Sequence, residues 1–228
     1  LEQHLINKCP KAARFGDVRN LILATSALLQ EKTPKNRGMV EMNKQVLLNN
    51  WEKLEQGLER MANLLESQGV FDEARLPTNA VLAVIAAAYE LVPEHGDFVA
   101  KAEKLLRAYL WSSFFTDRYE NSAASRAYAD FKGVKDKHRG IKDFLSNPTF
   151  KEDELSEIPV FNRNEHELAD VDALMAAGWP KKVGIEARGI LAVSNYFGAQ
   201  DFADSKSASY ESIQKREYHH IFPDALLS

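Results

Sequence analysis

The clearest hydrophobic pattern in the chain runs from Asn43 to Ser67. Its apolar positions recur at alternating steps of four and three residues, which places them on one stripe of a helix. They are Leu47, Trp51, Leu54, Leu58, Met61 and Leu65. The repeat covers only about three heptads, which is short for a coiled coil. We therefore expect this stripe to face a core.

Residues 80–92 are apolar on nearly every side, which is typical of a helix in the middle of a bundle. Thr78 or Asn79 is the expected N-cap of this helix. The next helix is expected from Phe98 to about Phe115, with Asp97 as its cap. No strand-rich pattern precedes residue 216. The sequence therefore predicts a mainly α fold, a multi-helix bundle.

The second half of the chain contains a candidate boundary near residues 146–160, where Asn147-Pro148 and an acidic run at 151–154 indicate a loop. A short amphipathic helix is expected at 164–177. Another helix is expected from Pro180 to about Phe197, closed by Gly198. Residues 1–210 are thus interpreted as a helical region.

Composition narrows the class of protein. Hydrophobic residues make up 45% and charged residues 27%, and the net charge is -4, which argues against a uniformly basic surface but allows a local basic face. The single cysteine, Cys9, fits a reducing compartment, and we expect a cytoplasmic protein. The longest apolar run, 80–88, is too short to cross a membrane. Because residue 1 is leucine, we expect a fragment of a longer chain. The sequence leaves open whether the protein forms a homo-oligomer.

Two basic stretches of the chain are candidates for contact with an anionic partner. Residues 126–142 carry Arg126, Lys132, Lys135, Lys137, Arg139 and Lys142 among aromatic side chains. This mixture suits contact with a nucleic-acid backbone, although a charged helix face is more often simply solvated. The cationic loop at 33–38 is interpreted as a solvated turn.

A turn after an aromatic helix end contains Arg118 and Tyr119. Such a turn can present both side chains to an anion. The alternative is a corner between helices, in which Arg118 pairs with Asp117 or Asp130. The sequence leaves both interpretations open.

The most unusual stretch is Arg216-Glu217-Tyr218-His219-His220-Ile221-Phe222-Pro223. Neutral imidazoles bind divalent metals and exchange protons near neutral pH. Neighbouring side chains on an extended backbone point to opposite faces, so one histidine can hold a metal while the other acts as a base. The alternative is a pair of structural histidines at the edge of a core.

This stretch, together with residues 76–79 (Leu-Pro-Thr-Asn), 109–119 and 121–124, resembles the GmrSD-type restriction endonuclease-like proteins of bacteria. The resemblance covers most of residues 15–228. Proteins of this family join an N-terminal ParB-like NTP-binding and nuclease domain to a helical middle region and a C-terminal HNH nuclease. The resemblance implies that residues 1–210 are the helical middle region and that 211–228 begin a ββα-metal finger.

The resemblance also implies the site and its partners. It assigns His219 to the metal position and His220 to the general base, with Mg²⁺ or Mn²⁺ as cofactor and DNA as substrate. For DNA contact we expect Arg118, Tyr119, Arg126, Lys132, Lys135 and Arg139. Further HNH residues are expected after Ser228, so this fragment alone is expected to be inactive or nearly so.

Two alternatives remain. The helical region could be a non-catalytic module that relays NTP or DNA recognition from the upstream domain to the nuclease. It could also be a scaffold that binds other proteins or DNA, with His219 and His220 only structural.

Overall fold

A computed structural model of the chain describes residues 2–92, 96–146, 155–156, 158–178, 184–200 and 205–213. In these residues the protein is mainly helical, as the sequence predicts, and the β-structure is an isolated bridge between Gln200 and Ser207. The α-helices are α1 (Glu2–Lys8), α2 (Val18–Leu29), α3 (Asn36–Val40), α4 (Lys44–Asn49), α5 (Trp51–Ser67), α6 (Ala80–Tyr89), α7 (Asp97–Phe114), α8 (Ala123–Ser146), α9 (Val171–Ala176), α10 (Ile185–Tyr196) and α11 (Tyr210–Ile213). Short 3-10 helices are η1 (Ala12–Phe15), η2 (Glu73–Arg75), η3 (Asp117–Tyr119) and η5 (Pro159–Phe161).

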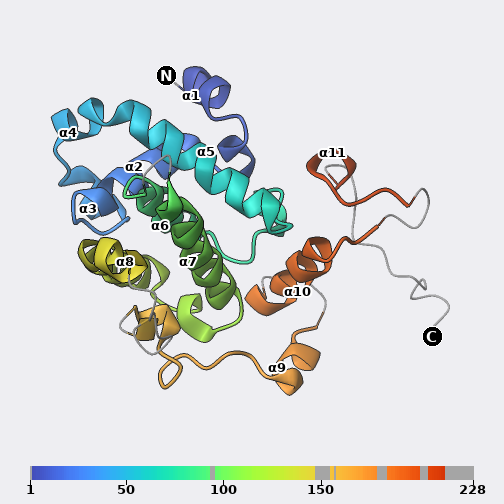
Figure 1. Cartoon of the computed structure of the whole chain (residues 1–228). Helices are drawn as coiled ribbons and strands as arrows, with labels where there is room; N and C mark the ends of the chain where they lie inside the picture. Colours follow the sequence, from blue (N-terminus) through green and yellow to red (C-terminus); the bar gives the residue numbers. More distant parts are fainter. Residues whose placement is uncertain are drawn as a thin grey trace.

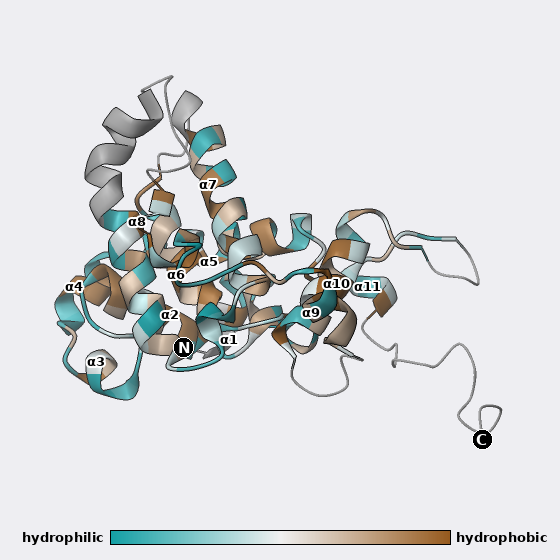
Figure 2. Ribbon diagram, turned by 90° about the horizontal axis from the view of Figure 1, so that it is seen from below, coloured by the Kyte–Doolittle hydropathy of each residue, from teal (hydrophilic) through white to brown (hydrophobic). Residues whose placement is uncertain are grey.

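Helix α6 lies in the centre of the helical body, with α2, α5 and α8 packed around it (Figure 1). Every residue from Val81 to Tyr89 is buried, which confirms that the all-round apolar pattern belongs to the middle of the bundle. Figure 2 shows hydrophobic residues gathered where these helices meet. Helices α9 to α11 lie to one side of this body (Figure 1).

The stripe predicted over Asn43–Ser67 faces the core, but it belongs to two helices. Leu54, Leu58 and Met61 on α5 are fully buried. The break falls at Asn50, whose side-chain amide donates to the carbonyl of Val46 at 2.8 Å. Asparagine side chains compete with the backbone for hydrogen bonds in this way, and this ends α4.

Helix α5 approaches α6 closely at Gly57. A Cβ atom at Gly57 would lie 2.7 Å from the carbonyl oxygen of Ala86, which is closer than such atoms pack. Only glycine therefore allows the two backbones to approach to this distance.

One of the two predicted helix caps differs from the expectation and the other is confirmed. Helix α7 begins after Gly96, which has a φ of 109° and is the N-cap in place of Asp97. At the start of α6, Asn79 occupies the cap position, and the hydroxyl of Thr78 accepts a hydrogen bond from the backbone N–H of Ala80 at 3.3 Å. The prediction that Thr78 or Asn79 caps this helix is therefore confirmed.

The chain beyond the candidate boundary at 146–160 returns to the same core. Ile158 and Val160 are fully buried, and η5 packs against α7 and α8. Gly133 on α8 makes room for this segment, because a Cβ atom there would lie 3.1 Å from Cα of Ile158. One hydrophobic core therefore includes residues on both sides of that position.

The helix expected at 164–177 is shorter than predicted. It forms only from Val171 to Ala176, because Asp170 caps it by accepting from the N–H of Ala173 at 2.8 Å. The preceding segment is tied instead to α7, since the N–H of Ala169 donates to the carbonyl of Phe115 at 2.8 Å. Helix α10 ends before Gly198, which has a φ of 85°, as expected.

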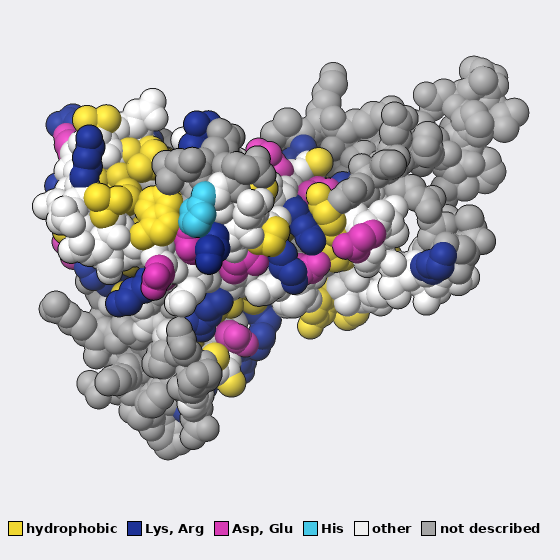
Figure 3. Space-filling model, turned by 90° about the horizontal axis from the view of Figure 1, so that it is seen from above, with side chains coloured by type: hydrophobic (Ala, Val, Ile, Leu, Met, Phe, Trp, Pro, Cys, Tyr) yellow, Lys and Arg dark blue, Asp and Glu magenta, His cyan; other side chains and the backbone are white. Residues whose placement is uncertain are grey.

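One face of the molecule is mixed in charge. On the face shown in Figure 3, Lys and Arg side chains are interspersed with Asp and Glu. None of the helices in the described residues is long and apolar enough to span a membrane.

Candidate functional site

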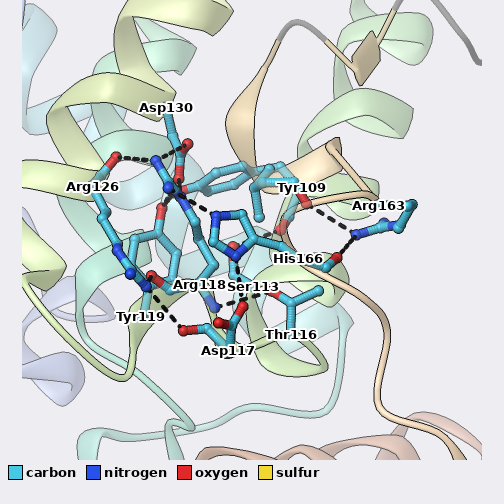
Figure 4. Close-up of polar contacts among 11 residues, drawn as sticks. Tyr109, Ser113, Thr116, Asp117, Arg118, Tyr119, Arg126, Asp130, Arg163 and His166 are labelled. Carbon is cyan, nitrogen blue, oxygen red and sulfur yellow. Dashed lines mark hydrogen bonds and ion pairs between the residues drawn. The ribbon is translucent and has the colours of Figure 1, made fainter.

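A buried polar network joins the end of α7, η3, the first half of α8 and the segment after η5 (Figure 4). Thr116 shapes η3, because its hydroxyl accepts from the N–H of Arg118 at 3.4 Å and donates to the carbonyl of Ser112 at 2.8 Å. Arg118 and Tyr119 then point inward and are only 6% and 4% exposed. The centre of the network therefore lies inside the protein.

The centre of the network is an ion pair between Arg118 and Asp130. Nε of Arg118 donates to Oδ2 of Asp130 at 3.2 Å, and Nη2 donates to Oδ1 at 2.9 Å. Burial raises the pKa of Asp130, while hydrogen bonds from Arg118, Tyr119 and the N–H of Val160 act in the opposite direction. Because all of these partners donate, Asp130 is placed to accept them as a carboxylate.

Two tyrosines extend the network into the core. The hydroxyl of Tyr119 donates to Oδ2 of Asp130 at 2.6 Å, and it also contacts the hydroxyl of Tyr109. Since the Tyr119 proton points to Asp130, Tyr109 must donate to Tyr119. Burial raises the pKa of both phenols well above the ordinary value of 10.0, so both are neutral.

His166 connects the network to the surface. Its Nδ1 lies 2.6 Å from Oδ1 of Asp117, and its Nε2 lies 3.1 Å from Nη1 of Arg118. A guanidinium can only donate, so Nε2 of His166 must accept and the ring proton must be on Nδ1. His166 is therefore a neutral imidazole, buried between Arg118 and the exposed carboxylate of Asp117.

Two further arginines bind backbone carbonyls around the network. Nη1 of Arg126 donates to the carbonyls of Asp117 at 3.1 Å and Arg118 at 2.7 Å. Nη2 of Arg163 donates to the hydroxyl of Ser112 at 2.8 Å, which ties the segment after η5 to α7. Desolvation lowers the pKa of Arg163. Both guanidinium groups thus fix turns and loops.

A hollow of about 620 Å³ lies beside the network, between α7 and residues 155–168. Arg163 is the one charged side chain among the described residues that line it, and this guanidinium also donates to the carbonyl of Val160 at 3.0 Å. The remaining lining is small, apolar or amide. No group in this described lining is placed as a nucleophile or a general base.

The network is satisfied internally. Among the described residues, the buried side-chain polar atoms without a partner are Thr25 Oγ1 and Arg188 Nε, and neither belongs to it. The described residues also contain no group of three or more His, Cys, Asp or Glu side chains able to hold a metal ion. With neutral phenols, a neutral imidazole and a paired carboxylate, the arrangement is suited to holding chain segments together.

Two residues of the DNA-contact prediction lie in the interior of the protein. Arg118 and Tyr119 are buried and bonded to Asp130, so their side chains are not available to a DNA backbone. The helix-corner alternative, with Arg118 paired to Asp130, is the arrangement observed. Arg126 is partly buried on the carbonyls of the η3 turn.

The other predicted DNA contacts lie on α8. Lys132 is exposed, and Lys135 forms an ion pair with Glu31 at 2.5 Å. Arg139 belongs to α8, but its side chain lies outside the described residues. His219 and His220 also lie outside the described residues. Of the ββα finger expected at 211–228, only residues 211–213 are described, and they belong to helix α11.

Sequence reasoning missed His166 and Arg163 and gave Asp130 only as one alternative partner. A pattern did exist for Asp130, because it lies on the same helical stripe as the buried Ala127, Phe131 and Val134. A single acid on an apolar stripe indicates a buried partner. His166 offered no comparable pattern, because it follows a polar run that reads as an exposed turn.

Comparisons with protein-family models, curated proteins and solved structures find no match to this chain. Its function is therefore argued from its own residues and motifs.

Proposed function

We propose that this chain is part of a metal-dependent DNA endonuclease of the HNH type, with a restriction or defence role. The observation that carries the proposal is the stretch Tyr218-His219-His220-Ile221-Phe222-Pro223, which follows a helical region. The mainly helical architecture of the described residues supports the part of the proposal that concerns a helical middle region.

The proposed chemistry uses the two histidines in different roles. His220 acts as the general base that takes a proton from water, which a neutral imidazole does well near pH 7. His219 supplies one ligand to a divalent metal, Mg²⁺ or Mn²⁺. When bound, the metal offsets negative charge on the phosphate and the leaving oxygen. One imidazole does not complete such a site, so the proposal requires further ligands from sequence after Ser228.

In this proposal the helical region connects an upstream NTP-binding domain to the nuclease. The buried network around Arg118 and Asp130 supports a positioning role, because it joins α7, α8 and the segment after η5 through directional hydrogen bonds. Rigid elements with satisfied polar contacts hold a site in place better than free loops do.

A plasmid-nicking assay of the intact protein with Mn²⁺ or Mg²⁺ tests the proposal. We expect His220→Ala to reduce the rate of nicking by about 10²–10⁴-fold, which is the usual contribution of a general base. His4→Ala is a matched control, since His4 is an exposed histidine on α1 and should keep the wild-type rate. DNA binding by His220→Ala should be unchanged. If His220→Ala nicks DNA at the wild-type rate, His220 is not the general base and the proposal is wrong.

A second candidate function is a scaffold that binds another protein. Large apolar side chains are exposed on and around α9 and α10, and they favour this alternative; they are Leu168 at 52%, Val171 at 74%, Met175 at 82%, Tyr196 at 51% and Phe197 at 80% exposed. If the intact protein does not nick the plasmid with either Mg²⁺ or Mn²⁺, the scaffold is favoured.

A further inference from the structure

The connection between α2 and α3 lies along the first half of α8, although about a hundred residues separate them in sequence. Nζ of Lys35 donates to the hydroxyl of Ser125 at 3.3 Å. At the other end, the hydroxyl of Tyr128 donates to the carbonyl of Glu31 at 3.1 Å, and Lys135 pairs with the Glu31 side chain. Figure 1 shows α3 beside α8 in the same part of the molecule.

This contact brings together two cationic stretches that the sequence shows separately. Residues 31–44 and 125–135 contain seven Lys or Arg and three Asp or Glu, and one of those acids, Asp130, is buried with Arg118. The whole chain has the opposite balance, with 29 Lys or Arg against 33 Asp or Glu. Positive charge is therefore concentrated here in a protein that is acidic overall.

The cationic side chains of this region form a basic surface, which we define as Lys32, Lys35, Arg37, Lys132 and Lys135; Lys32 and Lys135 are partly buried and the other three are exposed. Lys35 and Lys132 are exposed, and the side chain of Arg37 is 90% exposed. Ser125 and Lys135 are separated by ten helical residues, or about 15 Å of helix. That length faces about four phosphates along one strand of duplex DNA.

The acids within the basic surface do not neutralise it. Glu31 pairs with Lys135, and Glu41 pairs with Arg37 at 3.0 Å. Both acids are well exposed, at 63% and 47% of the side chain. Exposed pairs of this kind are weak, so these cations remain free to exchange partners with phosphate oxygens.

We propose that the basic surface binds the sugar–phosphate backbone of duplex DNA and does not read base sequence. The inference rests on the proposed nuclease function for the choice of DNA as the polyanion. It replaces the buried Arg118 and Tyr119 with Lys35 and Arg37, which belong to the stretch 33–38 that the sequence analysis interpreted as a solvated turn, and with the preceding Lys32. Lysine and arginine contacts to phosphates supply affinity and orientation without sequence specificity.

The test is fluorescence anisotropy of a short labelled DNA duplex across a salt series. We expect Lys35→Glu with Lys132→Glu to weaken binding by at least about tenfold, and to flatten the dependence of log K on log salt by about two units. The matched control carries the same change in charge on other helices, at the exposed Lys8 of α1 and Lys104 of α7. The control should change affinity by less than about threefold, because distant exposed charges are screened.

Several outcomes overturn the inference. Equal weakening in the test and control variants would show that only net charge matters. Equally tight binding of phosphatidylserine vesicles, lost in the same variant, would assign the basic surface to membranes instead.

Thermal unfolding midpoints within about 2 °C of wild type show that the variants are folded.

The proposed function fails separately from this inference. If the intact protein nicks DNA through His220 while the basic-surface variant binds and cuts like wild type, the nuclease proposal holds and this surface is wrong. If wild type binds the duplex through the basic surface but no metal supports nicking, the surface holds and the nuclease proposal fails.

Discussion

Arg118 and Asp130 form a two-point ion pair in which the side chains are 8% and 0% exposed. The pair joins η3 to α8. Arg118 also donates to His166 and to the carbonyl of Arg126, and Asp130 also accepts from Tyr119 and from the N–H of Val160. Removing either charge would leave the other buried without its partner. The pair is therefore a strict requirement for the local fold, even though buried pairs are not in general strongly stabilising.

Asp130→Ala should lower the free energy of unfolding by about 3–5 kcal/mol, because it leaves the Arg118 guanidinium buried and unpaired. Urea unfolding followed by circular dichroism measures this change. Arg37→Ala removes an exposed pair with Glu41 and should cost no more than about 0.5 kcal/mol. Similar values for the two variants would contradict the role of burial.

Glu90 should make stability depend on pH. Desolvation by burial raises its pKa from 4.5 to about 7, with Lys53 and Arg60 acting in the opposite direction. Between pH 4.5 and about 7 the folded protein holds a proton on Glu90 that the unfolded chain releases. The contribution of Glu90 to the free energy of unfolding is therefore complete below pH 4.5 and is lost as the pH rises through about 7. Since Glu90 is only partly buried, we expect a loss of about 1–2 kcal/mol.

Glu90→Gln should remove this fall and leave the variant more stable than wild type at pH 8. Unfolding in urea at a series of pH values gives the comparison. High salt provides the control, because it screens charge–charge interactions but leaves a desolvation effect in place. A wild-type profile that is flat between pH 4.5 and 7 contradicts the prediction.

His166→Ala should loosen the segment after η5. The substitution removes the acceptor for Nη1 of Arg118. A buried donor left without an acceptor lowers the free energy of unfolding by about 1–3 kcal/mol. A glutamate-specific protease should then cut faster at the neighbouring Glu165 and Glu167, by about tenfold. His4→Ala is the control, and equal cutting in the two variants would exclude a role for the His166 contacts.

Gly57→Ala should destabilise the protein by about 1–3 kcal/mol, the usual cost of overpacking. Its new methyl group would lie 2.7 Å from the carbonyl oxygen of Ala86, so α5 and α6 would have to separate. Alanine at the neighbouring, exposed Gln56 should change stability by less than about 0.5 kcal/mol. If Gly57→Ala were stabilising, the gain in helix propensity would outweigh the close contact.

The core was predictable where a local pattern defines it. The all-round apolar run of α6 and the stripe on α5 each indicate a buried surface from neighbouring residues alone. The break between α4 and α5 was not predicted, because the apolar spacing continues through Asn50 and only the asparagine side chain interrupts the backbone. Patterns of hydrophobic spacing do not register such local competition.

The polar network could be predicted only in part. In the sequence, Arg118 looks like a surface residue. Its ion-pair partner could be narrowed only to Asp117 or Asp130. His166 lies 48 residues from Arg118, and no periodic pattern links two positions that meet only after the chain has folded. The same limit applies to the basic surface, since Lys35 and Ser125 are 90 residues apart.

The burial of Ile158 and Val160 against α7 and α8 has a consequence for biosynthesis. While the ribosome has released only the earlier helices, the apolar side chains of α7 and α8 that this segment covers are open to water, and Asp130 lacks the N–H of Val160. The nascent chain must then wait for residue 161 to emerge before this region can close. An expression product that stops at Ser146 would leave these apolar side chains permanently exposed and should precipitate or recruit chaperones.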